Sequence, residues 1–230
     1  MRAYLKAWSG ALGRDMEVLR FGDRGLPVLV FPTSQGRFYQ WEDFGLVDAL
    51  RDKIDQGHIQ LWCVDSVDSE SWYDGGKHPR DRVLRHLDYE RYLVDELIPA
   101  MPERPVVTGT SFGAFHALLL ALRRPHSLRG FVALSGAYDT AHWLDGYFDD
   151  EVYLVSPLAF LPGLDDPSYL GPISGFEKKV IATGRDDANA AESIQAGELL
   201  RAKGVDVGLD VWDGWVHDWP HWKEMMRIYV

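Results

Sequence analysis

The chain has 230 residues, of which 46% are apolar and 26% are charged, as in an ordinary globular protein with one domain and one large core. Its net charge of −11 argues against nucleic acids and anionic membranes as partners, because both attract basic surfaces. No apolar run is long enough to span a bilayer, and the first residues lack the apolar core of a signal peptide. The single cysteine, Cys63, excludes an intrachain disulfide. These features favour a cytoplasmic enzyme or binding domain.

The first half of the chain alternates predicted strands with loops and helices. Strands are expected at residues 2–8, 15–21, 27–31 and 59–64. The run Gly22-Asp23-Arg24-Gly25 has the composition of a hairpin turn. The third and fourth strands are largely apolar, as strands buried on both faces of a sheet are. Helices are expected at 46–56 and 87–101, with an irregular segment rich in Trp, Tyr and Gly at 70–80.

In the second half, strands are expected at 106–109, 128–134, 179–183 and 205–212, and the last two helices at 189–203 and 219–229. A segment rich in Pro and aromatic residues interrupts this alternation at 140–170 and is too short for a large lid. The alternation predicts a single α/β domain over residues 1–230, with a mainly parallel sheet and helices on both faces. The first two strands have a short link and are expected to be antiparallel to their neighbours.

One stretch of this pattern carries a chemical motif. Gly109-Thr110-Ser111-Phe112-Gly113 is a G-x-S-x-G sequence between a β-branched strand and a helix-forming run, which is the context of a nucleophile elbow. The tight turn strains the serine backbone and leaves no room for side chains at positions 109 and 113, so glycine fits both. Amides of the helix that begins there would face a developing negative charge. The motif therefore predicts Ser111 as a nucleophile.

A serine nucleophile needs a histidine to take its proton and an acid to orient that histidine, in the chain order Ser, Asp or Glu, His. Chemistry in open α/β sheets gathers at the carboxyl ends of strands, so the residues after the last two strands are the candidates. Gly184-Arg185-Asp186-Asp187 follows one strand, and His217 follows the other. We assign His217 as general base and acid and Asp187 as the orienting acid. Asp186 is the main alternative, and Asp139 is a weaker one.

Other histidines near the motif have simpler interpretations. His217 and His221 are four residues apart, but no third ligand of matching spacing accompanies them, so no metal site is predicted. His116 falls within the helix that follows Ser111 and is expected in the core or behind the site.

Two backbone amides are expected to hold the oxyanion of an acyl transfer. The Phe112 amide directly follows the nucleophile, and a second amide is expected from the loop at 32–36, with Ser34 as the best candidate. Trp72, Tyr73 and Trp143 lie in irregular segments that could line a substrate pocket. Packing of these aromatic side chains against the sheet is the alternative.

With these residues located, the chain resembles the esterase family of the α/β-hydrolases that includes S-formylglutathione hydrolase, feruloyl esterases and the mycolyltransferase antigens. The matching segments are spread over nearly the whole chain: Gly13-Arg14-Asp15, Glu96-Leu97-Ile98-Pro99, Gly109–Ala114, Ser135-Gly136, Gly184–Asp187 and His217-Asp218-Trp219. The resemblance implies an α/β-hydrolase fold, with Asp187 at the acid position of a G-x-x-D turn, and ester hydrolysis without a cofactor. The chain departs from the family at Thr33-Ser34, where a His-Gly or Asp-Gly pair is usual.

The leading hypothesis is a serine carboxylesterase that hydrolyses small or medium carboxylic or thio esters through an acyl-serine intermediate. An acyltransferase that passes the same acyl group to an alcohol is the first alternative. A non-catalytic binding module on this fold is the second, although such modules typically lose a member of the triad. The sequence does not determine the natural ester or the oligomeric state.

Overall fold

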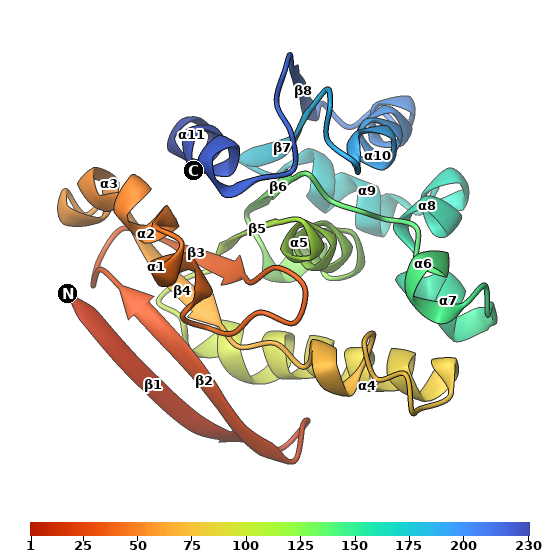
Figure 1. The fold of residues 1–230 in the computed structure, drawn as a ribbon, viewed down its shortest axis with the longest axis horizontal. Helices are drawn as coiled ribbons and strands as arrows, with labels where there is room; N and C mark the ends of the chain where they lie inside the picture. The colour runs from red at the N-terminus through yellow and green to blue at the C-terminus, as the bar shows by residue number, and fades with distance from the viewer.

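The computed structural model describes all 230 residues and is organised around one eight-stranded sheet (Figure 1). In spatial order its strands are β1 (Arg2–Ser9), β2 (Arg14–Phe21), β4 (Ile59–Val64), β3 (Leu26–Phe31), β5 (Val106–Thr110), β6 (Gly130–Leu134), β7 (Lys178–Gly184) and β8 (Gly208–Trp212). The β1–β2 and β2–β4 pairs are antiparallel, and every other pair is parallel. The expected α/β architecture, with antiparallel N-terminal strands, is confirmed.

The segment 22–25 differs from its prediction as a hairpin turn. It joins β2 to β3, but these two strands do not pair, because β4 lies between them in the sheet. Gly22 and Gly25 both have positive φ, and a Cβ atom on Gly25 would lie 2.4 Å from the carbonyl oxygen of Gly57. The turn therefore passes closely over the start of β4, and glycine is needed there for that crossing.

Helices cover both faces of the sheet. On one face lie α1 (Gln40–Asp43), α2 (Leu46–Ala49), α3 (Arg51–Asp55) and α11 (Trp219–Tyr229), whose apolar side chains share a core with Val28 and Val30 of β3. On the other face lie α4 (Pro79–Arg91), α5 (Phe112–Arg123) and α10 (Ala190–Ala202), which share a core with Leu29 and Phe31 of the same strand. Alternate residues of β3 thus enter opposite cores, as the apolar run predicted.

Two predicted helices have different limits in the structure. The helix expected at 46–56 is interrupted at the buried Leu50, which separates α2 from α3. The helix expected at 87–101 begins earlier, at Pro79, because His78 caps it: the His78 Nδ1 accepts a hydrogen bond from the Arg80 amide at 3.2 Å. That helix continues through the π-helical turn η2 (Tyr92–Leu97) and ends in η3 (Ile98–Ala100). Sequence periodicity alone missed the capped first turns.

The excursion after β6 is a set of short helices that extends to residue 174. They are α6 (Ala141–Leu144), α7 (Asp150–Val155), α8 (Pro157–Phe160), η5 (Leu161–Gly163) and α9 (Pro167–Ser174). Leu144, Val155 and Ile173 are fully buried in the same core as α4 and α5. Two further short helices lie outside this excursion: η1 (Asp68–Glu70) follows β4, and η4 (Pro125–Ser127) follows α5. The excursion is therefore anchored to the body of the protein by its apolar residues.

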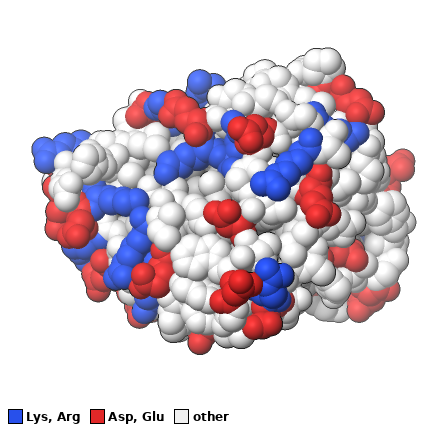
Figure 2. Space-filling view, turned by 90° about the horizontal axis from the view of Figure 1, so that it is seen from above, with Lys and Arg blue, Asp and Glu red and all other residues white.

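The distribution of charge, the hydropathy of the helices and the burial of Cys63 agree with the composition of the chain. Acidic and basic side chains are interspersed over the face shown in Figure 2, with neutral areas between them. None of the helices combines the length and the hydropathy that crossing a bilayer requires. Cys63 is a free, buried thiol in β4, and burial raises its pKa. It is therefore an inert core residue.

The turn from β5 into α5 has the strained geometry that the G-x-S-x-G motif predicted. Ser111 sits at its tip with φ 56° and ψ −123°, and its amide donates to the Leu134 carbonyl of β6 at 2.9 Å. A Cβ atom on Gly109 would lie 2.3 Å from the carbonyl carbon and oxygen of Gly113. A Cβ atom on Gly113 would lie 2.6 Å from the carbonyl oxygens of Phe31 and Pro32. Backbone is thus packed against backbone on both sides of the serine.

We expect Gly109→Ala to lower the free energy of unfolding by about 1–3 kcal/mol, because the added methyl group has only backbone to displace. Gly75→Ala is the matched control, since Gly75 is exposed, has no positive φ, and has no atom beyond its chain neighbours within 4 Å of an added Cβ. That control should be neutral or slightly stabilising. Urea denaturation of both variants measures the difference, and equal stabilities would contradict the close packing at the turn.

His86 of α4 provides a second prediction, for the dependence of stability on pH. It is buried, neither ring nitrogen has a hydrogen-bond partner, and its ring centroid lies 5.1 and 5.4 Å from those of Trp72 and His116. Burial holds the pKa of His86 well below its ordinary value of 6.5, so the unfolded chain takes up a proton there that the folded protein refuses. Folding stability should therefore fall as the pH drops below 6.5.

His86→Phe removes this titration and leaves no donor or acceptor without its partner. The variant should lose less stability than the unsubstituted protein between pH 6.5 and pH 5, by up to about 1.4 kcal/mol per pH unit. Urea denaturation of both proteins across that range measures the difference. Parallel stability curves would show that His86 is protonated in the folded state.

Candidate active site

The structure brings together Ser111, His217 and Asp187, which the sequence places far apart. Ser111 follows β5, Asp187 follows β7, and His217 lies in the loop between β8 and α11, so all three lie at the carboxyl edge of the parallel strands. The Nε2 atom of His217 is 2.9 Å from the Oγ atom of Ser111. Its Nδ1 atom is 2.9 and 3.1 Å from the two carboxylate oxygens of Asp187. The three side chains form one continuous chain of hydrogen bonds.

These distances assign the protons of the resting site. A carboxylate only accepts hydrogen bonds, so the Nδ1 atom of His217 carries its proton and donates it to Asp187. The Nε2 atom then has a free lone pair and accepts the hydroxyl proton of Ser111. This is the tautomer that a histidine needs in order to act as a general base toward the serine.

Asp187 is held by more than its histidine. Its carboxylate is inaccessible to solvent and also accepts a hydrogen bond from the Asn189 amide at 2.8 Å. Burial by itself would raise the pKa of Asp187, but hydrogen bonds from His217, the Asn189 amide and the Ser135 hydroxyl together hold that pKa below its ordinary value. Asp187 is therefore ionised at neutral pH.

The two alternative acids lie elsewhere. Asp186 is exposed, and its backbone amide donates to the Trp215 carbonyl at 3.1 Å. Asp139 is also exposed, and its carboxylate accepts from the Ala141 amide at 3.0 Å at the start of α6. Neither carboxylate contacts His217. The geometry thus favours Asp187, the acid preferred from the sequence, over its neighbour.

Behind the histidine lie Trp222 and Ser135, which fall in or next to segments that match the esterase family but to which the sequence assigned no role. The ring of Trp222 meets that of His217 edge to face, with centroids 4.8 Å apart, and its Nε1 donates to the Ser135 hydroxyl at 3.0 Å. Ser135 has φ 55° directly after β6 and also contributes its hydroxyl to Asp187. Its position at the end of the strand beside the nucleophile is the signal that could have identified it.

The residues expected to supply the two amides also lie beside Ser111. Phe112 is the first residue of α5, where amides have no partner within the helix. Ser34 lines the same cavity as Ser111 and His217. The amides of its neighbours are occupied, since that of Thr33 donates to the Gln40 Oε1 at 2.8 Å and that of Gln35 donates to a carboxylate. Of these three loop amides, only that of Ser34 has no acceptor within the protein.

A cavity of about 390 Å³ opens over Ser111. Phe112 and Trp143 form an apolar wall, their ring centroids 4.7 Å apart. Polar side chains also line the cavity, among them His142, whose Nε2 is 2.8 Å from the Glu192 Oε1. The remaining lining residues are Ala137, Ala188 and Asn189. A cavity of this size and mixed polarity suits a small organic ligand.

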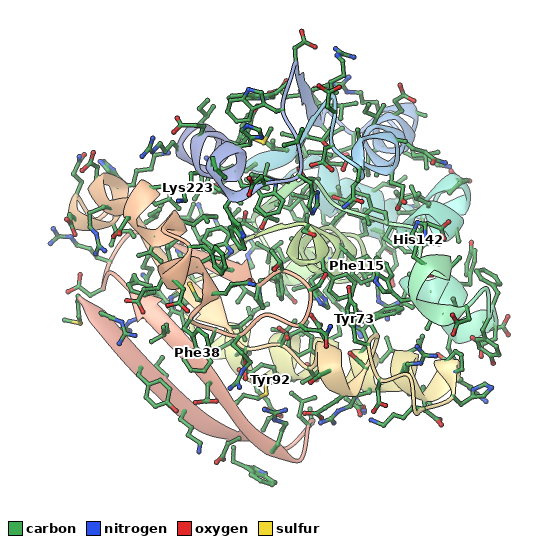
Figure 3. The ribbon with its side chains drawn as sticks, in the orientation of Figure 1. Phe38, Tyr73, Tyr92, Phe115, His142 and Lys223 are labelled. Carbon is green, nitrogen blue, oxygen red and sulfur yellow. The ribbon has the colours of Figure 1, made fainter.

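Of the three aromatic side chains expected at the pocket, Trp143 lines it. Tyr73 lies at its edge: its hydroxyl donates to the Ser34 Oγ at 2.8 Å and accepts from the Trp143 Nε1 at 3.0 Å. Tyr73 and His142 both lie beside α5, although they come from the segment before α4 and from α6 (Figure 3). Trp72 does not reach the cavity. It is 1% exposed and packs in the core against Phe115, because a large apolar ring gains most from complete burial.

The two other histidines have structural partners. The Nδ1 atom of His221 accepts a hydrogen bond from the Val216 amide at 3.0 Å, which helps to shape the loop that carries His217. His116 points from α5 into the interior, where its Nε2 is 3.0 Å from the Oδ1 of Asp68. Both positions agree with the predictions that these residues lie outside the triad.

Comparison with known proteins finds the fold in solved structures. No protein-family model matches the sequence, and no curated protein matches it. A ferulic acid esterase superposes with a TM-score of 0.77 over 99% of this chain and 95% of its own, at 15% identity. An S-formylglutathione hydrolase from Agrobacterium tumefaciens has a TM-score of 0.73 over 99% of this chain and 92% of its own, at 15% identity. A fluorophosphonate-binding serine hydrolase from Staphylococcus aureus has a TM-score of 0.67 over 99% and 96%, at 15% identity. The chain has the α/β-hydrolase fold.

Proposed function

We propose that the protein is a serine carboxylesterase that hydrolyses small or medium carboxylic or thio esters through an acyl-serine intermediate. The observation that carries this proposal is the unbroken hydrogen-bond chain from Ser111 through His217 to Asp187, of which Ser111 and His217 line a cavity. The solved structures with the same fold include an esterase, a thioester hydrolase and a serine hydrolase, which supports the same reaction class.

The first half of the reaction forms the acyl-enzyme. The Nε2 of His217 takes the hydroxyl proton while the Oγ of Ser111 attacks the ester carbonyl carbon. The carbonyl oxygen becomes an oxyanion, which the amides of Phe112 and Ser34 stabilise by hydrogen bonds. The imidazolium then donates its proton to the leaving alcohol or thiol as the bond from that group to the carbonyl carbon breaks.

The second half uses the same groups with water as the nucleophile. His217 takes a proton from a water molecule in the cavity as the water oxygen attacks the acyl carbon. The imidazolium then returns a proton to the Oγ of Ser111 as its bond to the acyl carbon breaks, which releases the carboxylic acid and regenerates the serine hydroxyl. Asp187 remains ionised throughout, because its pKa lies below the ordinary range. Its negative charge holds the imidazole in place and stabilises the imidazolium in both halves.

The shape and polarity of the cavity favour a particular kind of ester. Phe112 and Trp143 offer apolar surface to a bound substrate, and the pair of His142 and Glu192 offers polar groups. A volume of about 390 Å³ accommodates a small or medium ester. The carboxylate of Glu192 and the net charge of −11 disfavour anionic substrates.

Ser111→Ala should abolish turnover of short p-nitrophenyl esters while leaving the fold intact, because the hydroxyl contacts only His217 among the side chains. A fluorophosphonate probe should label the unsubstituted protein at Ser111 and leave the variant unlabelled. Hydrolysis rates, intact-protein mass spectrometry and thermal unfolding check the three expectations. Turnover that persists in the variant would refute the assignment of the nucleophile.

The neighbouring aspartates provide a matched pair for the acid. Asp187→Asn should lower kcat by about a thousandfold or more, because an amide facing Nδ1 no longer enforces the required tautomer. Asp186→Asn removes the same charge one residue away, on an exposed side chain, and should leave kcat within about twofold. Steady-state kinetics with one p-nitrophenyl ester compare the two. A larger loss of kcat in the Asp186 variant would show that Asp186, and not Asp187, is the acid.

A further inference from the structure

The loop that carries Ser34 is held in an unfavourable backbone conformation. Gln35 has φ 55°, in the left-handed region that non-glycine residues seldom adopt. Its amide donates a hydrogen bond to the Oδ2 of Asp68 at 3.1 Å. Farther along the loop, the Gly36 carbonyl accepts from the Ser66 hydroxyl at 2.8 Å. The segment after β4 therefore maintains the shape of the loop after β3.

Asp68 also connects this loop to the nucleophile helix. Its second carboxylate oxygen accepts a hydrogen bond from the Nε2 of His116 at 3.0 Å, and the side chains of Asp68 and His116 are 0% and 2% exposed. His116 belongs to α5, whose first amide is that of Phe112. A single buried carboxylate thus joins the elements that carry the two proposed oxyanion donors, Phe112 and Ser34.

Stability alone does not explain this arrangement. Burying a carboxylate is costly, and a buried polar pair is often no more stabilising than apolar side chains of similar volume. His116 is surrounded by apolar rings, with those of Phe31 and Phe112 at 5.6 and 4.8 Å. A leucine would suit that environment, whereas only a donor at this position can hold Asp68 toward Gln35.

We propose that Asp68 and His116 are positioning residues for the oxyanion hole. Their hydrogen bond sets the distance between α5 and the loop at 32–36, so that the Ser34 and Phe112 amides converge on the same oxygen. Neither side chain lines the cavity, so both act through the backbone that they hold. This inference rests on the proposed esterase function and adds to it a device that acts on the transition state.

Tyr73 is attached to the same loop in a different way. Its hydroxyl bonds the side-chain oxygen of Ser34, whereas Asp68 bonds the backbone of the next residue. Orientation of the Ser34 amide therefore depends on the backbone anchor at Gln35. Loss of the Asp68 anchor should affect the oxyanion more than it affects binding of the ground-state ester.

The test compares Asp68→Asn, His116→Leu and His116→Gln. We expect the first two to lower kcat by about 10- to 100-fold, below the loss of an entire oxyanion donor, with KM within about twofold. A trifluoromethyl ketone, which adds Ser111 to form an oxyanion, should bind more weakly by the same factor. His116→Gln still offers an N–H to Asp68 and should retain most of the activity.

Ser71→Ala is the matched control, because it removes a buried hydrogen bond of 2.9 Å to the Val67 carbonyl in the same segment without touching Gln35. It should leave kcat and inhibitor binding within about twofold. If Asp68→Asn does not fold, the contrast between leucine and glutamine at position 116 decides the question. Folded Asp68 and His116 variants with unchanged kcat would overturn the positioning role, as would losses confined to KM.

The experiments distinguish failure of the esterase proposal from failure of the positioning role. If the unsubstituted protein hydrolyses no ester and Ser111 resists the fluorophosphonate, the esterase assignment is wrong irrespective of the variants. If the unsubstituted protein is active and Asp68→Asn matches it, the esterase assignment stands and the positioning role is wrong.

Discussion

The contact of backbone with backbone around Ser111 is the constraint on which the rest of the site depends. Gly109 touches Gly113, and Gly113 touches the end of β3, so the chain can reverse direction within a few residues only where side chains are missing. That reversal places Ser111 at the carboxyl end of β5, and α5 begins at the next residue. One local packing requirement therefore supplies both a hydroxyl that lines the cavity and a helix amide beside it.

The parallel sheet supplies the other members of the site. Because β5, β6, β7 and β8 run in the same direction, the loops after them meet at one edge. The acid and the base of the proposed triad come from the last two of those loops, and Ser135 after β6 supports the acid. His217 is 106 residues from Ser111 along the chain, yet their side chains form a hydrogen bond. The parallel arrangement of the strands therefore brings residues that are distant along the chain into contact.

Buried polar groups then give the site its rigidity. Asp187 and Asp68 are both buried carboxylates, and each accepts from a histidine and from a backbone amide. The two clusters have parallel construction and different tasks: Asp187 orients the proposed general base, and Asp68 is proposed to hold an oxyanion loop. Each carboxylate is satisfied only when two segments of chain are correctly placed, so both penalise small displacements of the site.

Local patterns of residues were enough to predict the strands, the alternation that makes the sheet mainly parallel, and the elbow at Ser111, because apolar runs and G-x-S-x-G reflect short-range sterics. They made Asp187 the preferred acid, with Asp186 and Asp139 as alternatives, and the folded structure favours Asp187 because its buried carboxylate faces His217 whereas Asp186 is exposed. The pairing of β2 with β4, the burial of Trp72 and the bond between His116 and Asp68 were likewise decided in three dimensions. Each depends on contacts between segments that are distant in the sequence, and local patterns of residues do not predict such contacts.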